Sequence, residues 1–115
     1  MKNIVLPDTN ERSLAFYLAM EEFVAGQSEG DSFFVWRVSP TVIIGRNQDL
    51  EAEVNLGYCR EHGVKVVRRK SGGGCVYSDM GNIMISYVSR RGDVSEIFDR
   101  YLSALTACLR SLGLN

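Results

Sequence analysis

The sequence predicts an α+β fold, in which helices pack on a mixed, mostly antiparallel sheet. Short runs of β-branched and aromatic residues alternate like strands, and three longer segments have the apolar spacing of helices. The expected order is strand, helix, strand pair, helix, strand, strand pair and helix. With 115 residues, 45% of them hydrophobic and 23% charged, the chain is expected to form one domain over residues 1–115.

The first elements are expected to be a strand over residues 2–6 and a helix over about 9–25. Asp8 followed three residues later by Glu11 is typical of a capping box. Gly26 is the expected C-terminal stop of the helix.

The inner stripe of this helix includes a carboxylate, Glu21. The other members of the stripe are Leu14, Tyr17, Leu18 and Val24. Because a buried carboxylate needs partners, two interpretations stay open. Glu21 either pairs with a buried arginine or with backbone amides, or it belongs to a binding site.

Two hairpins are expected. Residues 32–38 and 41–46 alternate like strands around Ser39-Pro40, and Asp79-Met80-Gly81-Asn82 predicts a turn before a strand over 83–88. In the first hairpin, Phe34, Trp36 and Val38 share one face. The lone tryptophan, Trp36, is either a core aromatic or the wall of an apolar pocket.

Two further helices are expected, over residues 51–62 and 94–112. Gly63 closes the first of them. Asp93 and Glu96 form a second capping-box pattern, and the last helix has a strong apolar face that ends before Gly113.

The most informative stretch is a run of three glycines that follows a predicted strand over residues 64–69. Glycine suits positions where the backbone approaches another group closely or adopts dihedral angles that a Cβ forbids. Exposed amides beside the guanidinium groups of Arg68 and Arg69 would suit a phosphate or a carboxylate. Neither a P-loop nor a dinucleotide fingerprint fits, since Tyr77 stands where the latter needs a glycine. A flexible surface loop with a solvated basic cluster also fits the composition.

The composition limits which other classes of function and which compartment fit this chain. The formal net charge of −1 disfavours a broad nucleic-acid footprint, so an RNA-binding patch at residues 68–70 is a weak interpretation. Three widely spaced cysteines and one histidine predict neither a metal site nor a disulfide framework. Reduced thiols and the absence of a signal-like N-terminus favour the cytoplasm.

The motif R-R-x-S-G-G-G-x-V-[YF]-x-D-x-G-N, at residues 68–82, resembles the signature of lipoate–protein ligases. Three other stretches match in the same order, at residues 16–22, 34–37 and 41–48. These ligases share a superfamily with biotin–protein ligases and octanoyltransferases. The resemblance implies the fold of a biotin-ligase or class II synthetase catalytic domain, of which this chain would be the N-terminal, incomplete portion.

The resemblance also implies an activity. Lipoate–protein ligases use ATP with Mg²⁺ to convert lipoate to lipoyl-AMP, and then transfer the lipoyl group to a lysine of an acceptor domain. The implied partners are the lipoyl domains of 2-oxoacid dehydrogenase complexes or the H protein of glycine cleavage. No nucleic acid, membrane or resident metal site is expected.

Matching positions imply the site residues. Those that bind ATP or the acyl-adenylate are Arg69, Ser71, Gly72, Gly73, Gly74, Cys75, Val76 and Tyr77. Those around the lipoate pocket are Glu21, Trp36, Arg46, Ser78 and Asn82, with Gln48 as a secondary candidate. Ser78 stands where the family often has histidine, so its role would be limited to hydrogen bonding. Cys75, without a nearby histidine, is expected to be a small packed residue rather than a nucleophile.

The family's catalytic lysine lies in a K-x-x-G-x-A stretch that would follow Asn115. No catalytic residue is therefore expected in this chain, and we expect it to be inactive in ligation by itself. Two alternatives stay open: an octanoyltransferase of the same superfamily, and a non-catalytic partner that binds the acyl-adenylate.

Overall fold

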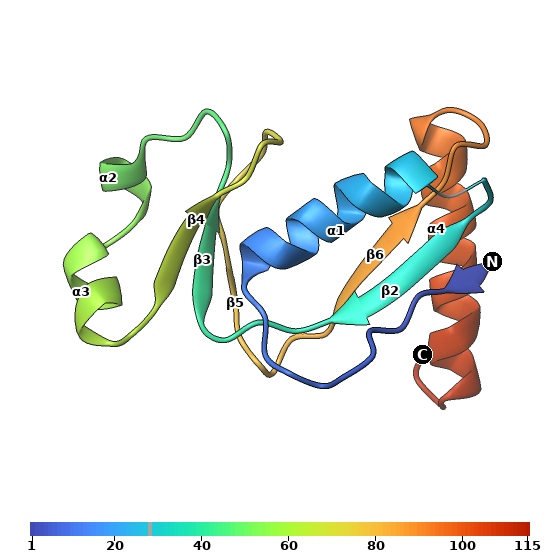
Figure 1. Cartoon of the computed structure of the whole chain (residues 1–115), viewed down its shortest axis with the longest axis horizontal. Coiled ribbons are helices and arrows are strands. Elements are labelled where there is room, and N and C mark those ends of the chain that lie inside the picture. Colours follow the sequence, from blue (N-terminus) through green and yellow to red (C-terminus); the bar gives the residue numbers. More distant parts are fainter. Residues whose placement is uncertain (28) are drawn as a thin grey trace.

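The computed structural model describes residues 1–27 and 29–115, and Figure 1 shows the arrangement of their helices and strands. The strands are β1 (Lys2–Asn3), β2 (Ser32–Trp36), β3 (Thr41–Ile44), β4 (Lys65–Arg68), β5 (Val76–Ser78) and β6 (Met84–Val88). The helices are α1 (Leu14–Gln27), α2 (Leu50–Glu53), α3 (Leu56–Glu61) and α4 (Val94–Ser111).

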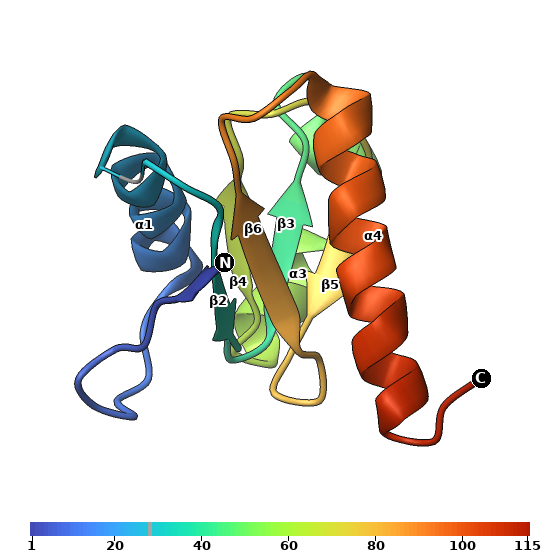
Figure 2. The ribbon, with the colours of Figure 1, turned by 90° about the vertical axis from the view of Figure 1, so that its right-hand side faces the viewer.

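The strands form two mixed sheets. In the first sheet the order is β1-β2-β6, and in the second it is β4-β3-β5. Each sheet combines one parallel pairing with one antiparallel pairing. Figure 2 shows α1 and α4 on opposite sides of the first sheet. The predicted α+β class with mixed sheets is confirmed, although the strands divide between two sheets instead of forming one.

Both predicted hairpins are wrong. β2 and β3 follow each other in the chain but lie in different sheets, and so do β5 and β6. The reason lies in the partners of β3, which pairs with β4 on one side and β5 on the other. The edges of β2 are likewise occupied by β1 and β6. The segments 37–40 and 79–83 therefore carry the chain from one sheet to the other.

The strand β3 separates two cores. Ile43 packs into the cluster that contains Leu14, Tyr17 and Trp36, while Ile44 packs with Val54 and other residues beside α2 and α3. Both isoleucines are buried, as expected for a strand that has apolar neighbours on both faces. The predicted burial of Phe34, Trp36 and Val38 on one face of their strand is confirmed.

The start and end of α1 differ from the prediction. Asp8 does not cap the helix, because its carboxylate accepts a hydrogen bond from the Asn10 amide and pairs with Arg12. The helix starts instead after Ser13, whose hydroxyl oxygen accepts a bond from the Phe16 amide at 3.3 Å. Gly26 lies within α1 and does not end it.

The helix predicted over 51–62 is two short helices. Between them Val54 turns into the second core, and the Asn55 side chain caps α3 by accepting a bond from the Tyr58 amide. Gly63 follows α3 with a φ of +66°, a conformation that glycine adopts without steric cost. The loss of helical geometry at residues 54–55 thus lets an apolar side chain reach the core.

Helix α4 confirms the predicted capping box. The Asp93 carboxylate accepts a bond from the Glu96 amide at 3.0 Å, and the Glu96 carboxylate accepts one from the Asp93 amide at 2.9 Å. Gly113 ends the helix with a φ of +85°. The apolar face of α4 is uncovered, however, since no residue of this helix is buried and Phe98 is 58% exposed.

A buried carboxylate, Asp31, connects α4 to the first sheet. It accepts hydrogen bonds from the Tyr87 hydroxyl, from the Ser89 hydroxyl at 2.5 Å and from the Arg91 guanidinium at 2.8 and 3.1 Å. Arg100 of α4 lies 3.5 Å from the same carboxylate. These bonds, first those from Arg91, hold the pKa of Asp31 far below its ordinary value. Burial and the hydrogen bond to Asp31 raise the pKa of Tyr87.

Within the part of the chain that the structure describes, no helix is both long enough and apolar enough to cross a membrane.

The uncovered face of α4, together with the free edge of β6, predicts that the chain self-associates. Sedimentation velocity at rising concentration should show masses above the 12.8 kDa of one chain. The double variant Phe98→Glu, Leu102→Glu should return the protein towards the monomer, because it places two charges on the apolar face. Ala107→Glu, on the opposite face of α4, is the matched control. A wild-type chain that stays monomeric would contradict the prediction.

Replacing Asp31 with asparagine should lower the free energy of unfolding at pH 7 by about 2 kcal/mol, since charged hydrogen bonds are lost. The depressed pKa of Asp31 means that its stabilising effect is present above the unfolded-state pKa of about 3.9 and is lost as the pH falls below that value. Urea unfolding at pH 7 and pH 3 should therefore show the difference between wild type and Asp31→Asn shrinking in acid. Asp99→Asn, an exposed position on α4, should change little at either pH.

Candidate functional site

The glycine run forms a loop between β4 and β5, as predicted, and Arg69 organises it. The guanidinium of Arg69 donates hydrogen bonds to the carbonyl oxygens of Gly72 at 2.8 Å and Gly74 at 2.7 Å. It also donates one to the carbonyl of Ile43 in β3 at 3.4 Å. Arg69 thus lies beside the three-glycine bend, and its guanidinium serves as the hydrogen-bond donor to three main-chain carbonyl oxygens.

The loop packs against the end of β3 through main-chain atoms. A Cβ on Gly45 would lie 2.1 Å from the carbonyl oxygen of Gly73, a distance that no side chain tolerates. Gly73 itself has a φ of +103°, in the region that favours glycine. The Arg46 amide donates to the Ser71 carbonyl at 2.9 Å on the same side. Gly73, one of the predicted site glycines, is therefore required by backbone geometry, and Gly45, which was not among the predicted site residues, is required by close approach.

The amides of the loop differ from its carbonyls. Among the residues that the structure describes, the backbone N–H groups of Gly72, Gly73 and Gly74 donate no hydrogen bond. All three glycines are exposed. Because unpaired N–H groups in succession attract anions, the loop presents donors to solvent while its carbonyls are held by Arg69.

Arg68 supports the loop on the side of β3. Its guanidinium donates to the carbonyl oxygens of Gly45 at 3.0 Å, Arg46 at 3.1 Å and Gln48 at 2.7 Å. The Gln48 side-chain oxygen accepts a bond from the Gly45 amide at 2.8 Å. Arg68 and Gln48 consequently fix the turn that faces the glycine loop.

A chain of polar side chains crosses from α1 to the first sheet. The indole N–H of Trp36 donates to the Ser86 hydroxyl at 2.9 Å, and this hydroxyl donates to the Glu21 carboxylate at 2.5 Å. Trp36 also stacks on Tyr17, with ring centroids 4.7 Å apart. Glu21 points inward, as predicted, and its partner is a serine rather than an arginine or a backbone amide.

A cavity of about 540 Å³ adjoins this chain. Glu21, Glu22 and Ser86 are among the residues that line it, together with parts of β6 and Ile97 of α4. Trp36 lies behind Ser86 in the core, 6% exposed, and does not line the cavity. Lys70 of the glycine loop pairs with Glu22 at 2.9 Å. This ion pair places the basic end of the loop next to the rim of the cavity.

The other predicted site residues lie around this centre. Arg46 is exposed, and Cys75 packs in the second core, as expected for a small packed residue. Val76 is exposed at the start of β5, and Tyr77, also exposed, donates to the Asp79 carboxylate at 3.1 Å. Partial desolvation and this carboxylate raise the pKa of Tyr77.

Ser78 ends β5, and Asn82 lies in the turn that follows, at the end of this strand away from the glycine loop. Ser78 is buried, and its hydroxyl contacts the Met84 sulfur at 3.6 Å. The Asn82 side-chain oxygen accepts a bond from the Asp79 amide at 3.0 Å, so it holds the predicted turn. The structure does not bring these two residues together with the loop amides.

Sequence reasoning missed several contributors. Ser86 gave no signal, because its neighbours in the chain are ordinary strand residues and its partners are 50 and 65 positions away. The ion pair between Lys70 and Glu22 could not be predicted either, because 48 positions separate the two residues in the sequence. Arg68 stood next to the glycine loop, but its role in fixing the opposite turn depends on the pairing of β3 with β4.

Among the described residues, no group of three or more histidine, cysteine, aspartate or glutamate side chains is arranged to hold a metal ion. The fold and the site together define an α+β domain that offers main-chain donors to an anion beside a partly enclosed cavity.

Comparison with known proteins identifies the family. The family model of the lipoyl protein ligase A/B catalytic domain matches residues 13–115. This chain therefore belongs to the lipoyl protein ligase A/B catalytic domain family, which confirms the predicted resemblance to lipoate–protein ligases.

Individual relatives agree. Lipoate–protein ligase 1 of Staphylococcus aureus is 39% identical over 101 residues, which are 85% of this chain and 31% of that protein. The structure of a putative lipoate protein ligase from Thermoplasma acidophilum with bound lipoic acid matches with a TM-score of 0.81 at 31% identity, over 99% of this chain and 48% of that chain. A lipoate–protein ligase A bound with ATP matches with a TM-score of 0.82 at 30% identity, over 99% and 47%. The chain thus spans about a third of the Staphylococcus ligase and about half of the two solved chains.

Gly45→Ala should displace the glycine loop, because its Cβ would overlap the Gly73 carbonyl oxygen. We expect a loss of about 1–3 kcal/mol in unfolding free energy, as for other overpacked sites, and shifted amide resonances throughout residues 71–75. Gly72→Ala is the matched control, since a Cβ there meets no atom within 4 Å. Equal spectra and equal stability for the two variants would contradict the proposed main-chain packing.

Proposed function

We propose that this chain supplies the adenylate-binding part of a lipoate–protein ligase, an enzyme that activates lipoate with ATP and passes the lipoyl group to a lysine of an acceptor domain. In the first step a lipoate carboxylate oxygen attacks the α-phosphorus of ATP, and pyrophosphate leaves. In the second step the lysine amine attacks the carbonyl carbon of lipoyl-AMP, loses a proton and displaces AMP. The observation that carries the proposal is the glycine loop, with three unpaired amides and carbonyls held by Arg69.

The loop suits an acyl-adenylate because its donors are arranged before the ligand arrives. Arg69 holds the Gly72 and Gly74 carbonyls, so the amides of Gly72 to Gly74 are the groups left to meet a phosphate or a carboxylate. Donors that need no reorganisation stabilise developing negative charge most effectively. Ser71, Cys75, Val76 and Tyr77 complete the proposed nucleotide-binding stretch. No side chain of this set has to act as a nucleophile.

The acyl group is assigned to the cavity beside Glu21 and Ser86. Its lining combines the apolar β6 and Ile97 with a few convergent polar groups, as ligand pockets do. Trp36 acts through Ser86, whose hydroxyl it holds by the indole N–H. Arg46, Ser78 and Asn82 do not line this cavity, and their proposed place near lipoate rests on the family resemblance alone.

ATP and Mg²⁺ are both implied by the family. The described residues hold no ready-made cluster of metal ligands, so they do not fit a dedicated Mg²⁺ site, and we assign the ion no role in the steps above. The proposed acceptors are lipoyl domains of 2-oxoacid dehydrogenase complexes or the H protein of glycine cleavage, and the proposed compartment is the cytoplasm.

Arg69→Ala should weaken the binding of a non-hydrolysable lipoyl-adenylate analogue by about tenfold or more, since hydrogen bonds to a charged group are lost and the loop is released. Arg69→Lys should fail to restore binding, because an ammonium cannot bond two carbonyls in a fixed fork. Isothermal titration calorimetry measures both. Arg60→Ala, on the exposed surface of α3, is the control and should bind like the wild type.

Wild-type binding in the Arg69→Ala variant would refute the role of the loop. Exchange of label between pyrophosphate and ATP, dependent on lipoate, then separates a ligase from an octanoyltransferase, which uses no ATP, when it is measured on a protein that includes the family's K-x-x-G-x-A stretch. A protein of that length that binds the analogue without exchange would be the non-catalytic partner that the sequence also allows.

A further inference from the structure

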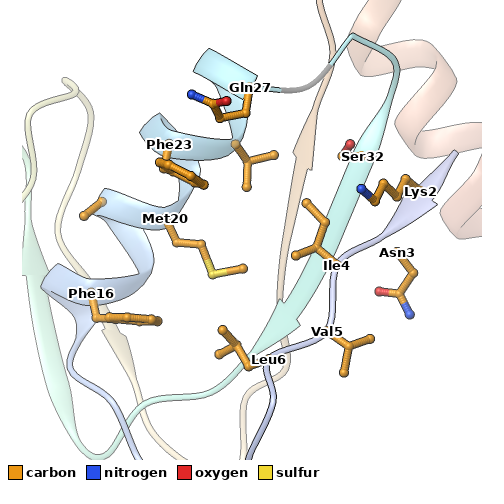
Figure 3. Close-up of a pocket in the computed structure, with 12 residues that line it drawn as sticks. Lys2, Asn3, Ile4, Val5, Leu6, Phe16, Met20, Phe23, Gln27 and Ser32 are labelled. Carbon is orange, nitrogen blue, oxygen red and sulfur yellow. The ribbon is translucent and has the colours of Figure 1, made fainter.

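A large cavity lies outside the proposed ligase site. It has a volume of about 780 Å³ and lies between α1 and the N-terminal segment that contains β1 (Figure 3). This volume falls within the range of about 300–1,000 Å³ that small-molecule sites occupy. None of the residues assigned to the adenylate or to lipoate lines it.

The two sites use different faces of α1. Glu21 faces Ser86 and the first sheet, whereas Phe16, Met20 and Phe23 line the 780 Å³ cavity. Consecutive residues of a helix lie about 100° apart, so Met20 and Glu21 open on separate spaces. A ligand in this cavity would not compete with lipoate for the same side chains.

The cavity is apolar at one end and polar at the other. Figure 3 shows Leu6 and Phe16 at one end, and Lys2 and Ser32 at the other. Lys2 is the only charged side chain among the described lining residues. It also takes part in no ion pair within the described parts of the chain. The cavity therefore offers one uncompensated positive charge next to an apolar surface.

The apolar surface is exposed to an unusual degree. Phe23 is 67% exposed and Val5 76% exposed, and both line the cavity. Exposed apolar side chains on both sides of a cavity with a polar end are typical of a binding site. An apolar chain in the cavity would cover these groups and bring a terminal anion to Lys2.

We propose that this cavity binds a medium-chain fatty carboxylate, with its alkyl chain along Phe16, Met20 and Phe23 and its carboxylate at the Lys2 ammonium. The single charge at the rim selects an anion over a cation, and the continuous apolar lining selects an unbranched alkyl chain over a polar metabolite. The ligand is a free carboxylate, since a single lysine at one end of an apolar cavity is not the broad basic face that would meet a membrane.

The four methionines provide the test. In protein labelled with ¹³C at the methionine methyl groups, Met20 reports on this cavity and Met84 on the region of Ser78 and Trp36. Titration with decanoate should shift the Met20 signal saturably and leave Met80 in place, and an additional shift of Met84 would report decanoate entering the lipoate region as well. A shift of Met84 without Met20 would place decanoate in the lipoate region and overturn the inference, and so would the absence of any saturable shift.

Two lysine variants test whether the positive charge of Lys2 contributes to decanoate binding. Lys2→Gln should weaken decanoate binding about fivefold, the size of one exposed charge pair. Lys65→Gln, which removes an exposed lysine from β4 in the other sheet, should have no effect. Decanol should bind the wild type about as weakly as decanoate binds Lys2→Gln. Equal affinities for decanoate in wild type and Lys2→Gln, or for decanoate and decanol in the wild type, would refute the proposed carboxylate contact.

Because Met20 lines the 780 Å³ cavity and calorimetry with the lipoyl-adenylate analogue tests the ligase site, failure of this inference and failure of the proposed ligase function are distinguishable. The analogue should bind whether or not decanoate moves the Met20 signal.

Discussion

Main-chain packing between Gly45 and Gly73 fixes the position of the glycine loop, and the rest of the site is built around that contact. Gly45 directly follows β3, which is buried on both faces by Ile43 and Ile44 and paired on both edges. Because β3 has packing partners on both faces and pairing strands on both edges, its backbone has little freedom to move. The position of Gly45, directly after β3, is therefore fixed by the core. The loop takes its position from β3 rather than from its own sequence.

Hydrogen-bonding capacity is divided unequally within the loop. The guanidinium of Arg69 satisfies two carbonyls of the loop and one of β3, while the amides of the three glycines have no partner among the described residues. A peptide segment usually satisfies its donors and acceptors together. Here a cation takes the acceptors, and the donors are left for an anion. The same arginine therefore serves the fold and the proposed chemistry.

Local patterns predicted part of the local structure, although the capping box at Asp8 and the helix stop at Gly26 were wrong. The capping box of α4, the burial of Phe34 and Trp36 and the inward position of Glu21 follow from spacing within a few residues. Strand pairing did not follow, because the turn chemistry of Ser39-Pro40 suits a hairpin and also a passage between sheets. The cluster at Asp31 could not be predicted either, since its partners lie 56 to 60 positions away. In the site, the glycine loop was recognisable from sequence, whereas Ser86 and the pairing of Lys70 with Glu22 required the tertiary structure.

That last ion pair is exposed, with 88% of the Lys70 side chain and 64% of the Glu22 side chain open to solvent. At physiological ionic strength, charges in water are screened over about 8 Å, so the contact is readily exchanged for counterions. A polyphosphate entering beside the loop is itself such a counterion. In the proposed function, a phosphate group beside the loop would compete with Glu22 for the Lys70 ammonium and leave the Glu22 carboxylate unpaired at the rim of the cavity.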